Sequence, residues 1–118
     1  MNLRQRQPRE HDEQHLAFVR GLPCVVCGNN IETEAAHIRY ADLRFAKPYT
    51  GRQEKPHDRW TVPLCGRHHT IQHSMNEREW WKLAEVDPVP VAMALALNSG
   101  DQSAGELIVR SCREQRAA

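Results

Sequence analysis

The feature that most constrains this chain is a pair of short cysteine-containing turns that lie far apart in the sequence. The first is Cys24-Val25-Val26-Cys27-Gly28, and the second is Cys65-Gly66-Arg67-His68. Tetrahedral zinc sites are commonly built from two such halves, each of which contributes two ligands separated by two residues. The spacing therefore predicts a structural Cys₃His zinc site, whose ligands are Cys24, Cys27, Cys65 and His68.

Length and composition agree with a small metal-stabilised protein. The 118 residues, with a formal net charge of +1, predict a single domain with a modest core, to which a zinc ion would add material stability. No apolar run is long enough to cross a membrane, and the polar N-terminal tail, residues 1–9, lacks the apolar region of a signal peptide. We therefore expect a cytoplasmic protein, in which cysteines are better interpreted as ligands than as disulfides.

The pattern of apolar residues, caps and turn residues predicts an α+β fold. We expect strands over residues 32–39 and 60–64, of which the second, with its proline, belongs at a sheet edge. A helix that begins near Gly66 follows directly. The other expected helices span residues 10–20, 77–86 with Asn76 as N-cap, 89–97, and a last one from a cap at Asp101 or Ser103 to about residue 113. The core then covers about residues 15–75 and the helical C-terminal part about residues 76–115.

Three histidines outside the zinc motif are candidates for a second site. His69 and His73 are four residues apart on the expected helix, so they share one face and suit two ligands of one metal ion. His37 lies on the first expected strand. A lone histidine there would be interpreted as a half-buried core residue, but the many neighbouring ligand types favour a functional role.

A long basic segment, residues 41–58, separates the two expected strands. A loop of this length in a small domain is usually functional or disordered. Its cations, together with Tyr40 and Tyr49, suit phosphate and base contacts, whereas charge alone predicts a solvated surface loop about equally well. The neighbouring metal ligands favour nucleic acid, with candidate contacts at Arg39, Arg44, Lys47, Arg52 and Lys55.

In this order of strand, basic loop, strand and histidine helix, the chain resembles the HNH, or ββα-metal, endonucleases. It is most similar to the recombination-enhancement (Ref) type nucleases of phages and prophages. The matching segments cover about residues 15–97 and include Leu22–Gly28, Ala35–Arg39, Lys55–Asp58 and Pro63–His69. The resemblance implies a zinc-stabilised ββα-metal core with flanking helices, hydrolysis of DNA phosphodiester bonds, and a role in recombination on DNA coated by a host recombinase.

Phosphodiester hydrolysis needs a base for the attacking water and a cation for the developing charge. We assign the base to His37, because a neutral imidazole suits this task near neutral pH. We expect the catalytic ion, Mg²⁺ or Mn²⁺, on His69 with His73 and an oxygen ligand. Asp58 is the best oxygen donor, but it could instead orient the His37 ring, and the sequence does not separate these roles.

Two positions depart from the wider HNH pattern. Ala36 stands where many such enzymes have an acidic or histidine metal ligand, and His68 stands where a cysteine is usual.

Other classes of function stay open. A non-catalytic zinc module that binds nucleic acid would leave His37, Asp58, His69 and His73 unexplained, and a zinc hydrolase for small molecules would need a pocket that the sequence does not indicate. Whether the substrate is single-stranded, duplex or branched DNA, or RNA, also stays open.

Overall fold

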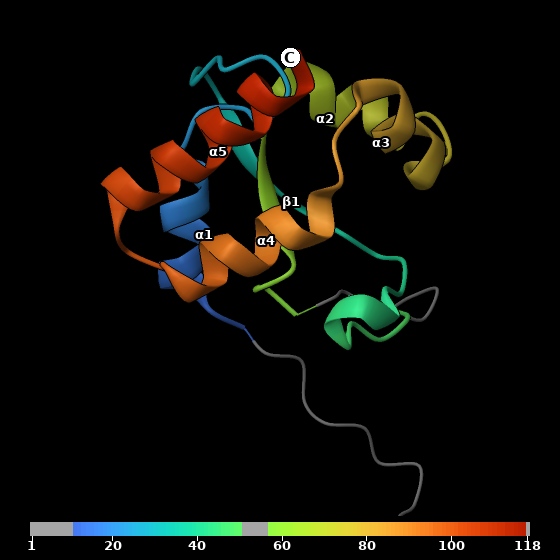
Figure 1. The fold of residues 1–118 in the computed structure, drawn as a ribbon, viewed down its shortest axis with the longest axis horizontal. Helices are drawn as coiled ribbons and strands as arrows, with labels where there is room; N and C mark the ends of the chain where they lie inside the picture. The colour runs from blue at the N-terminus through green and yellow to red at the C-terminus, as the bar shows by residue number, and fades with distance from the viewer. Residues whose placement is uncertain (1–10, 51–56, 118) are drawn as a thin grey trace, which may run out of the picture.

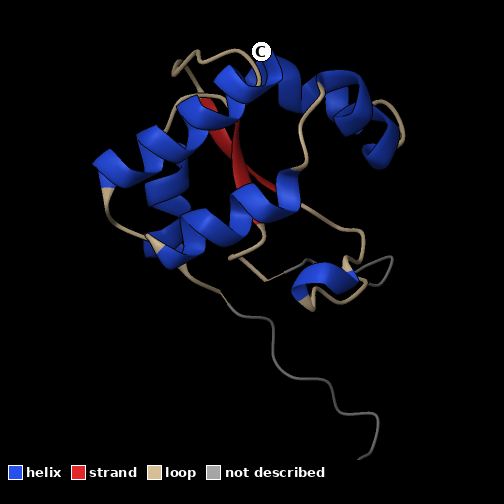
Figure 2. Cartoon of the chain, viewed as in Figure 1, coloured by secondary structure: helices blue, strands red, loops and turns tan. Residues whose placement is uncertain are grey.

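The computed structural model describes residues 11–50 and 57–117, and it confirms the α+β class. Two strands lie at the centre, and helices from both ends of the chain pack around them (Figure 1). In the view of Figure 2 the strands are visible through the gap between two helices of the C-terminal part. The elements in chain order are α1 (Glu13–Arg20), β1 (Thr33–His37), the 3-10 helix η1 (Leu43–Phe45), β2 (Thr61–Cys65), α2 (Gly66–His73), α3 (Glu77–Ala84), α4 (Pro88–Leu97) and α5 (Gln102–Ala117).

The two predicted strands form an antiparallel pair. Their register runs from Thr33 opposite Cys65 to His37 opposite Thr61. Strand β2 is buried along its whole length and continues directly into α2. On its other side the Pro63 carbonyl accepts a hydrogen bond from the N–H of Val25 at 2.9 Å. The hairpin therefore joins the first cysteine turn to the histidine helix.

Side-chain caps set the starts of the helices. Asp12 accepts a hydrogen bond from the N–H of His15 at 3.0 Å, so α1 begins at Glu13 rather than at residue 10. Asn76 caps α3 through the N–H of Glu79 at 3.1 Å, as predicted. Asp101 caps α5 in the same way, and this helix runs about one turn further than its sequence pattern indicated.

The core lies between the hairpin and the helices. Trp80 and Trp81 are both buried there and pack edge to face, with ring centroids 4.8 Å apart. Helix α5 approaches α1 closely at Gly105, where an added Cβ would lie 2.8 Å from Cζ of Phe18. Arg116, near the end of α5, donates to the Val26 carbonyl at 2.5 Å and so fastens the helix to the first cysteine turn.

Among the described residues, no helix combines the length and apolar character that membrane crossing requires.

The segment after β1 is more ordered than the prediction of a long loop indicated. Asp42 caps η1, and its backbone pairs with that of Lys47 in an isolated bridge. The chain then runs back past β1, where the N–H of Thr50 donates to the Arg39 carbonyl at 3.3 Å. The first half of the basic segment is therefore a folded turn held beside the hairpin; residues 51–56 lie outside the described part.

Candidate functional site

The structure brings together the four predicted zinc ligands. One ligand atom from each of Cys24, Cys27, Cys65 and His68 lies within 4.8 Å of the others. The sulfur atoms of Cys27 and Cys65 are 3.9 Å apart, and Nδ1 of His68 lies 3.2 Å from Sγ of Cys65 and 3.7 Å from Sγ of Cys24. Zinc bonds of about 2.3 Å to sulfur and about 2.0 Å to nitrogen place tetrahedral ligands about 3.5 to 3.8 Å apart. The group could therefore hold a zinc ion.

Local backbone structure explains why these ligands converge. The Cys24 carbonyl accepts the N–H of Gly28, whose φ of +77° closes the turn, and the Cys24 N–H donates to the Asn29 carbonyl. Cys65 stands at the junction of β2 and α2, and His68 lies on the first turn of that helix. Burial, together with Arg67 and Arg116, lowers the pKa of His68. This favours the neutral imidazole that a metal ligand requires.

A second pair of histidines lies on the exposed side of α2. The Nε2 atoms of His69 and His73 are 2.9 Å apart. Two nitrogen ligands at right angles on one ion, with bonds of about 2.1 Å, would be separated by about 3 Å, so the pair fits two neighbouring coordination positions. Nδ1 of His69 lies 2.7 Å from a carboxylate oxygen of Glu34 on β1. Such a carboxylate fixes the proton on Nδ1 and leaves the Nε2 lone pair for the metal.

His37 is held by a buried carboxylate at the end of β1. Its Nε2 lies 2.9 Å from Oδ1 of Asp58, which is fully buried. The second oxygen of Asp58 accepts the N–H of Asp12 at 2.7 Å and lies 3.0 Å from Nδ1 of His11. Asp58 therefore links the histidine of β1 to the residues that precede α1.

The contacts of Asp58 are made with residues other than the histidines of α2. Within the described part of the chain, the zinc cluster is the only group of three or more Cys, His, Asp or Glu ligand atoms that lie within 4.8 Å of one another. Both oxygens of Asp58 are already used by His37, Asp12 and His11. The ligand set of Asp58, His69 and His73 stays a prediction, and of the two roles left open for Asp58 these contacts favour orientation of His37.

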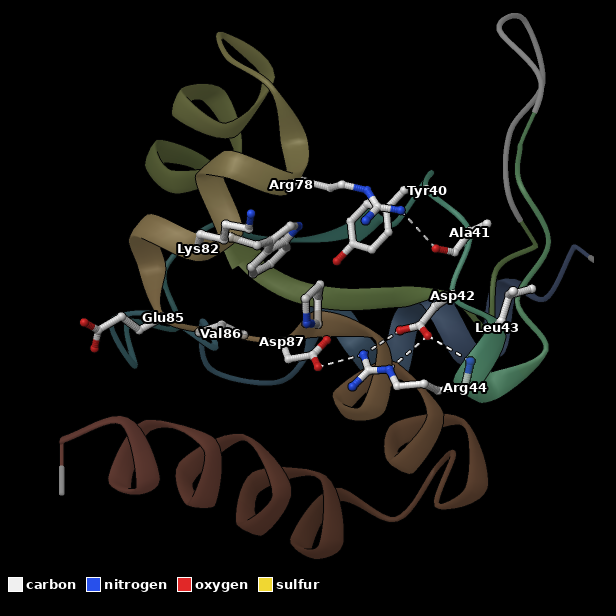
Figure 3. Close-up of a pocket in the computed structure, with 12 residues that line it drawn as sticks. Tyr40, Ala41, Asp42, Leu43, Arg44, Arg78, Lys82, Glu85, Val86 and Asp87 are labelled. Atoms are coloured by element: carbon white, nitrogen blue, oxygen red, sulfur yellow. Dashed lines mark hydrogen bonds and ion pairs between the residues drawn. The ribbon is translucent and has the colours of Figure 1, made fainter.

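The predicted phosphate contacts are also revised. Lys47 is only 1% exposed, and its Nζ donates to the Tyr40 carbonyl at 2.6 Å, so a phosphate cannot reach it without unpacking of the turn. Burial lowers its pKa to about 8. Arg44 is exposed, but its guanidinium makes three hydrogen bonds to Asp42 and Asp87, as Figure 3 shows. Of the remaining candidates, Arg39 is half-buried beside the hairpin, and Arg52 and Lys55 lie outside the described residues.

The comparisons with known proteins add a family but not an activity. Residues 2–85 match the family described as "Protein of unknown function (DUF968)". The chain belongs to the DUF968 family. No curated protein and no solved structure gives a significant match. The DUF968 match spans the zinc ligands, both strands and α2 and ends just after α3, whereas α4 and α5 lie beyond it.

Two residues at the site were missed from the sequence. Glu34 was assigned to the first strand without a role, because its partner His69 lies 35 residues further along the chain. His11 lies next to the cap of α1, and nothing in the sequence connects it to Asp58. Such partners come from segments that only the tertiary structure brings together.

Proposed function

We propose that this DUF968 protein is a metal-dependent endonuclease of the HNH, or ββα-metal, type that hydrolyses DNA phosphodiester bonds. The observation that carries the proposal is the convergence of Nε2 of His69 and His73, with the Glu34 carboxylate behind His69. A surface helix has no structural need for two imidazoles 2.9 Å apart, because each would be solvated at little cost. A shared cation fits this arrangement, as does a hydrogen bond between the two neutral rings, and the added carboxylate of Glu34 favours the cation.

Within this proposal each residue has a chemical task. His37 accepts the proton of the attacking water, and the buried Asp58 carboxylate orients its ring and stabilises the imidazolium that results. His69 and His73 hold the catalytic ion, which supplies positive charge for the phosphorane-like transition state when it is bound. Glu34 orients His69. The phosphate would lie between the α2 histidines and His37.

The chemistry of the donor set bears on which ion is used. With Asp58 assigned to the orientation of His37, the described part of the chain provides two imidazole nitrogens and leaves the other positions to water and phosphate. Imidazole suits transition metals better than it suits Mg²⁺, which prefers oxygen ligands. We therefore expect Mn²⁺ to support activity better than Mg²⁺.

A plasmid-nicking assay tests the proposed activity. Zinc-loaded protein should nick supercoiled DNA when Mn²⁺ is added, and it should do so less with Mg²⁺ and not at all with excess chelator. The matched control is His37→Ala purified in the same way, which should lose about 10²- to 10⁴-fold in rate. Equal nicking by wild type and His37→Ala would indicate a contaminating nuclease, and no nicking by wild type with any divalent ion would remove the proposal.

The second candidate is a non-catalytic zinc module that binds nucleic acid. It is favoured by one observation: among the described residues, the Cys₃His cluster is the only complete set of metal ligands. Such a module should bind DNA in a gel-shift assay and leave the plasmid intact under all of the conditions above. From the Ref-type resemblance we further propose that the protein acts in DNA recombination. Faster cutting of recombinase-coated DNA than of naked DNA would support this role.

A further inference from the structure

A hollow lies where the two elements that carry the candidate catalytic histidines both end. Strand β1 ends at His37, two residues before Arg39, and α2 ends at His73, three residues before Asn76. Such short connections span no more than about 7 to 10 Å between Cα atoms, so the hollow is lined by residues that closely follow both histidines in the chain, although neither histidine lines it. It encloses about 330 Å³ and is lined by Arg39, Tyr40, Tyr49, Thr50, Asn76, Glu77 and Arg78.

Backbone contacts hold the walls of this hollow in place. The N–H of Thr50 donates to the Arg39 carbonyl at 3.3 Å, which sets Tyr49 beside the chain that leaves β1. The Glu77 carboxylate accepts the N–H of Arg39 at 3.2 Å, so this acidic group faces backbone. Buried Lys47 fixes the carbonyl of Tyr40. The hollow is therefore built by the folded turn after β1 and by the start of α3.

The side chains at the hollow combine an exposed ring with an available cation. Tyr49 is 73% exposed. The guanidinium of Arg78 lies 4.6 Å from the centroid of the Tyr40 ring, and one of its five N–H groups donates to the Ala41 carbonyl. Figure 3 shows Arg78 extended across that ring, whereas Arg44 is turned toward two carboxylates. Arg44 makes three hydrogen bonds to carboxylates, so Arg78 presents more N–H donors to a ligand than Arg44 does.

We propose that this hollow binds one unpaired nucleotide close to the phosphate that is cut, with its base on Tyr49 and its phosphate on Arg78. The inference rests on the proposed nuclease function and specifies its substrate as nucleic acid that is single-stranded at the cut. A base stacked within a duplex cannot lie on a protein ring, whereas an unpaired base can. A volume of about 330 Å³ is within the usual range for small-ligand sites.

Binding measured without added divalent ion tests the subsite without cleavage. Fluorescence anisotropy with a short labelled single strand and with a duplex of the same sequence should show tighter binding of the single strand. Tyr49→Ala should weaken single-strand binding by about 5- to 150-fold and leave its salt dependence unchanged, because stacking releases no counterions. Tyr49→Phe should bind like wild type. Arg78→Gln should reduce the salt slope by about 0.7, and the matched charge control Arg110→Gln, on α5, should not.

Three results would overturn the subsite. The first is that Tyr49→Ala and Arg78→Gln bind the single strand as tightly as wild type does. The second is that the duplex binds as tightly as the single strand. The third is that polyglutamate displaces the labelled strand as well as unlabelled DNA does, which would indicate an acidic protein partner. The two proposals fail separately. If the protein shows the binding results above but never nicks DNA, the nucleotide subsite is supported and the nuclease proposal is refuted. If Tyr49→Ala nicks DNA as wild type does, only the subsite is refuted.

Discussion

Replacement of Cys65 by alanine tests the zinc assignment with the largest expected effect. Structural zinc contributes about 10 kcal/mol or more in small sites, whereas the whole free energy of unfolding of a domain is about 5 to 15 kcal/mol. Cys65 also joins β2 to α2, so loss of its sulfur loosens the strand, the helix and both cysteine turns together. We therefore expect Cys65→Ala to lose zinc and cooperative folding at the same time.

The assay combines metal content with a thermal melt. Wild type after gel filtration should contain about one zinc per chain and unfold in one transition followed by far-UV circular dichroism. Cys112→Ala is the matched control, because Cys112 is a partly buried cysteine on α5 that lies outside the cluster. It should keep its zinc and melt close to wild type.

A cavity left in the core could also destabilise Cys65→Ala, because Cys65 is buried. Cys27→Ala separates the two causes, since Cys27 is exposed and its truncation leaves no cavity. It should lose zinc and stability nearly as severely as Cys65→Ala. If Cys27→Ala and Cys65→Ala both retain one zinc per chain and melt with the Cys112→Ala control, the four residues do not form a structural zinc site.

Two further changes test the packing around the site. The pKa of Lys47 is 10.5 in the unfolded chain and about 8 in the folded protein, so between these pH values the unfolded state holds one more proton. As the pH rises through this window, the free energy of unfolding of wild type, measured with urea, should increase by up to about 3 kcal/mol relative to that of Lys47→Met. A difference in unfolding free energy that does not change with pH would contradict the burial of Lys47. Gly105→Ala should lower the melting temperature, because overpacking against Phe18 and Leu22 costs about 1 to 3 kcal/mol; the exposed Ser103→Ala on the same helix should not.

Short-range patterns in the sequence were sufficient for much of the fold. The zinc ligands were found because each half of the site is a local motif with fixed spacing, and both halves lie at element ends that the sequence also marks. Asn76 identified the start of α3 because a cap contacts a backbone group only three residues away. Such signals depend on neighbours in the chain, so a single sequence contains them.

The sequence was not sufficient where the contact partner of a residue is remote in the chain, or where burial of a side chain determines its role. Lys47 looked like a surface cation because nothing local shows that the turn folds back and covers it. The role of Asp58 stayed open between metal ligand and orienting group because its partners, His37 and Asp12, lie 21 and 46 residues away in the chain. The charge of a side chain can be read from the sequence, but the group that neutralises it cannot.

The two carboxylates behind the histidines give a prediction that separates the base from the metal ligands. Asp58 contacts His37, and Glu34 contacts His69. If the proposed roles are right, Asp58→Asn should lower the rate of nicking at saturating Mn²⁺, because the His37 ring loses its orienting charge, and the concentration of Mn²⁺ needed for half-maximal rate should not change. Asparagine keeps an acceptor for the Asp12 N–H, so the variant should remain folded.

Glu34→Gln should show the opposite behaviour. Loss of a carboxylate behind a metal-binding histidine typically costs about 10- to 100-fold in metal affinity, so half-maximal nicking should need that much more Mn²⁺, and the rate at saturation should approach that of wild type. Glu34 is exposed, so its change should leave the thermal melt unaltered. If instead Asp58→Asn raises the Mn²⁺ requirement and Glu34→Gln lowers only the saturated rate, then Asp58 supports the ion and Glu34 the base, and the roles of His37 and His69 must be exchanged.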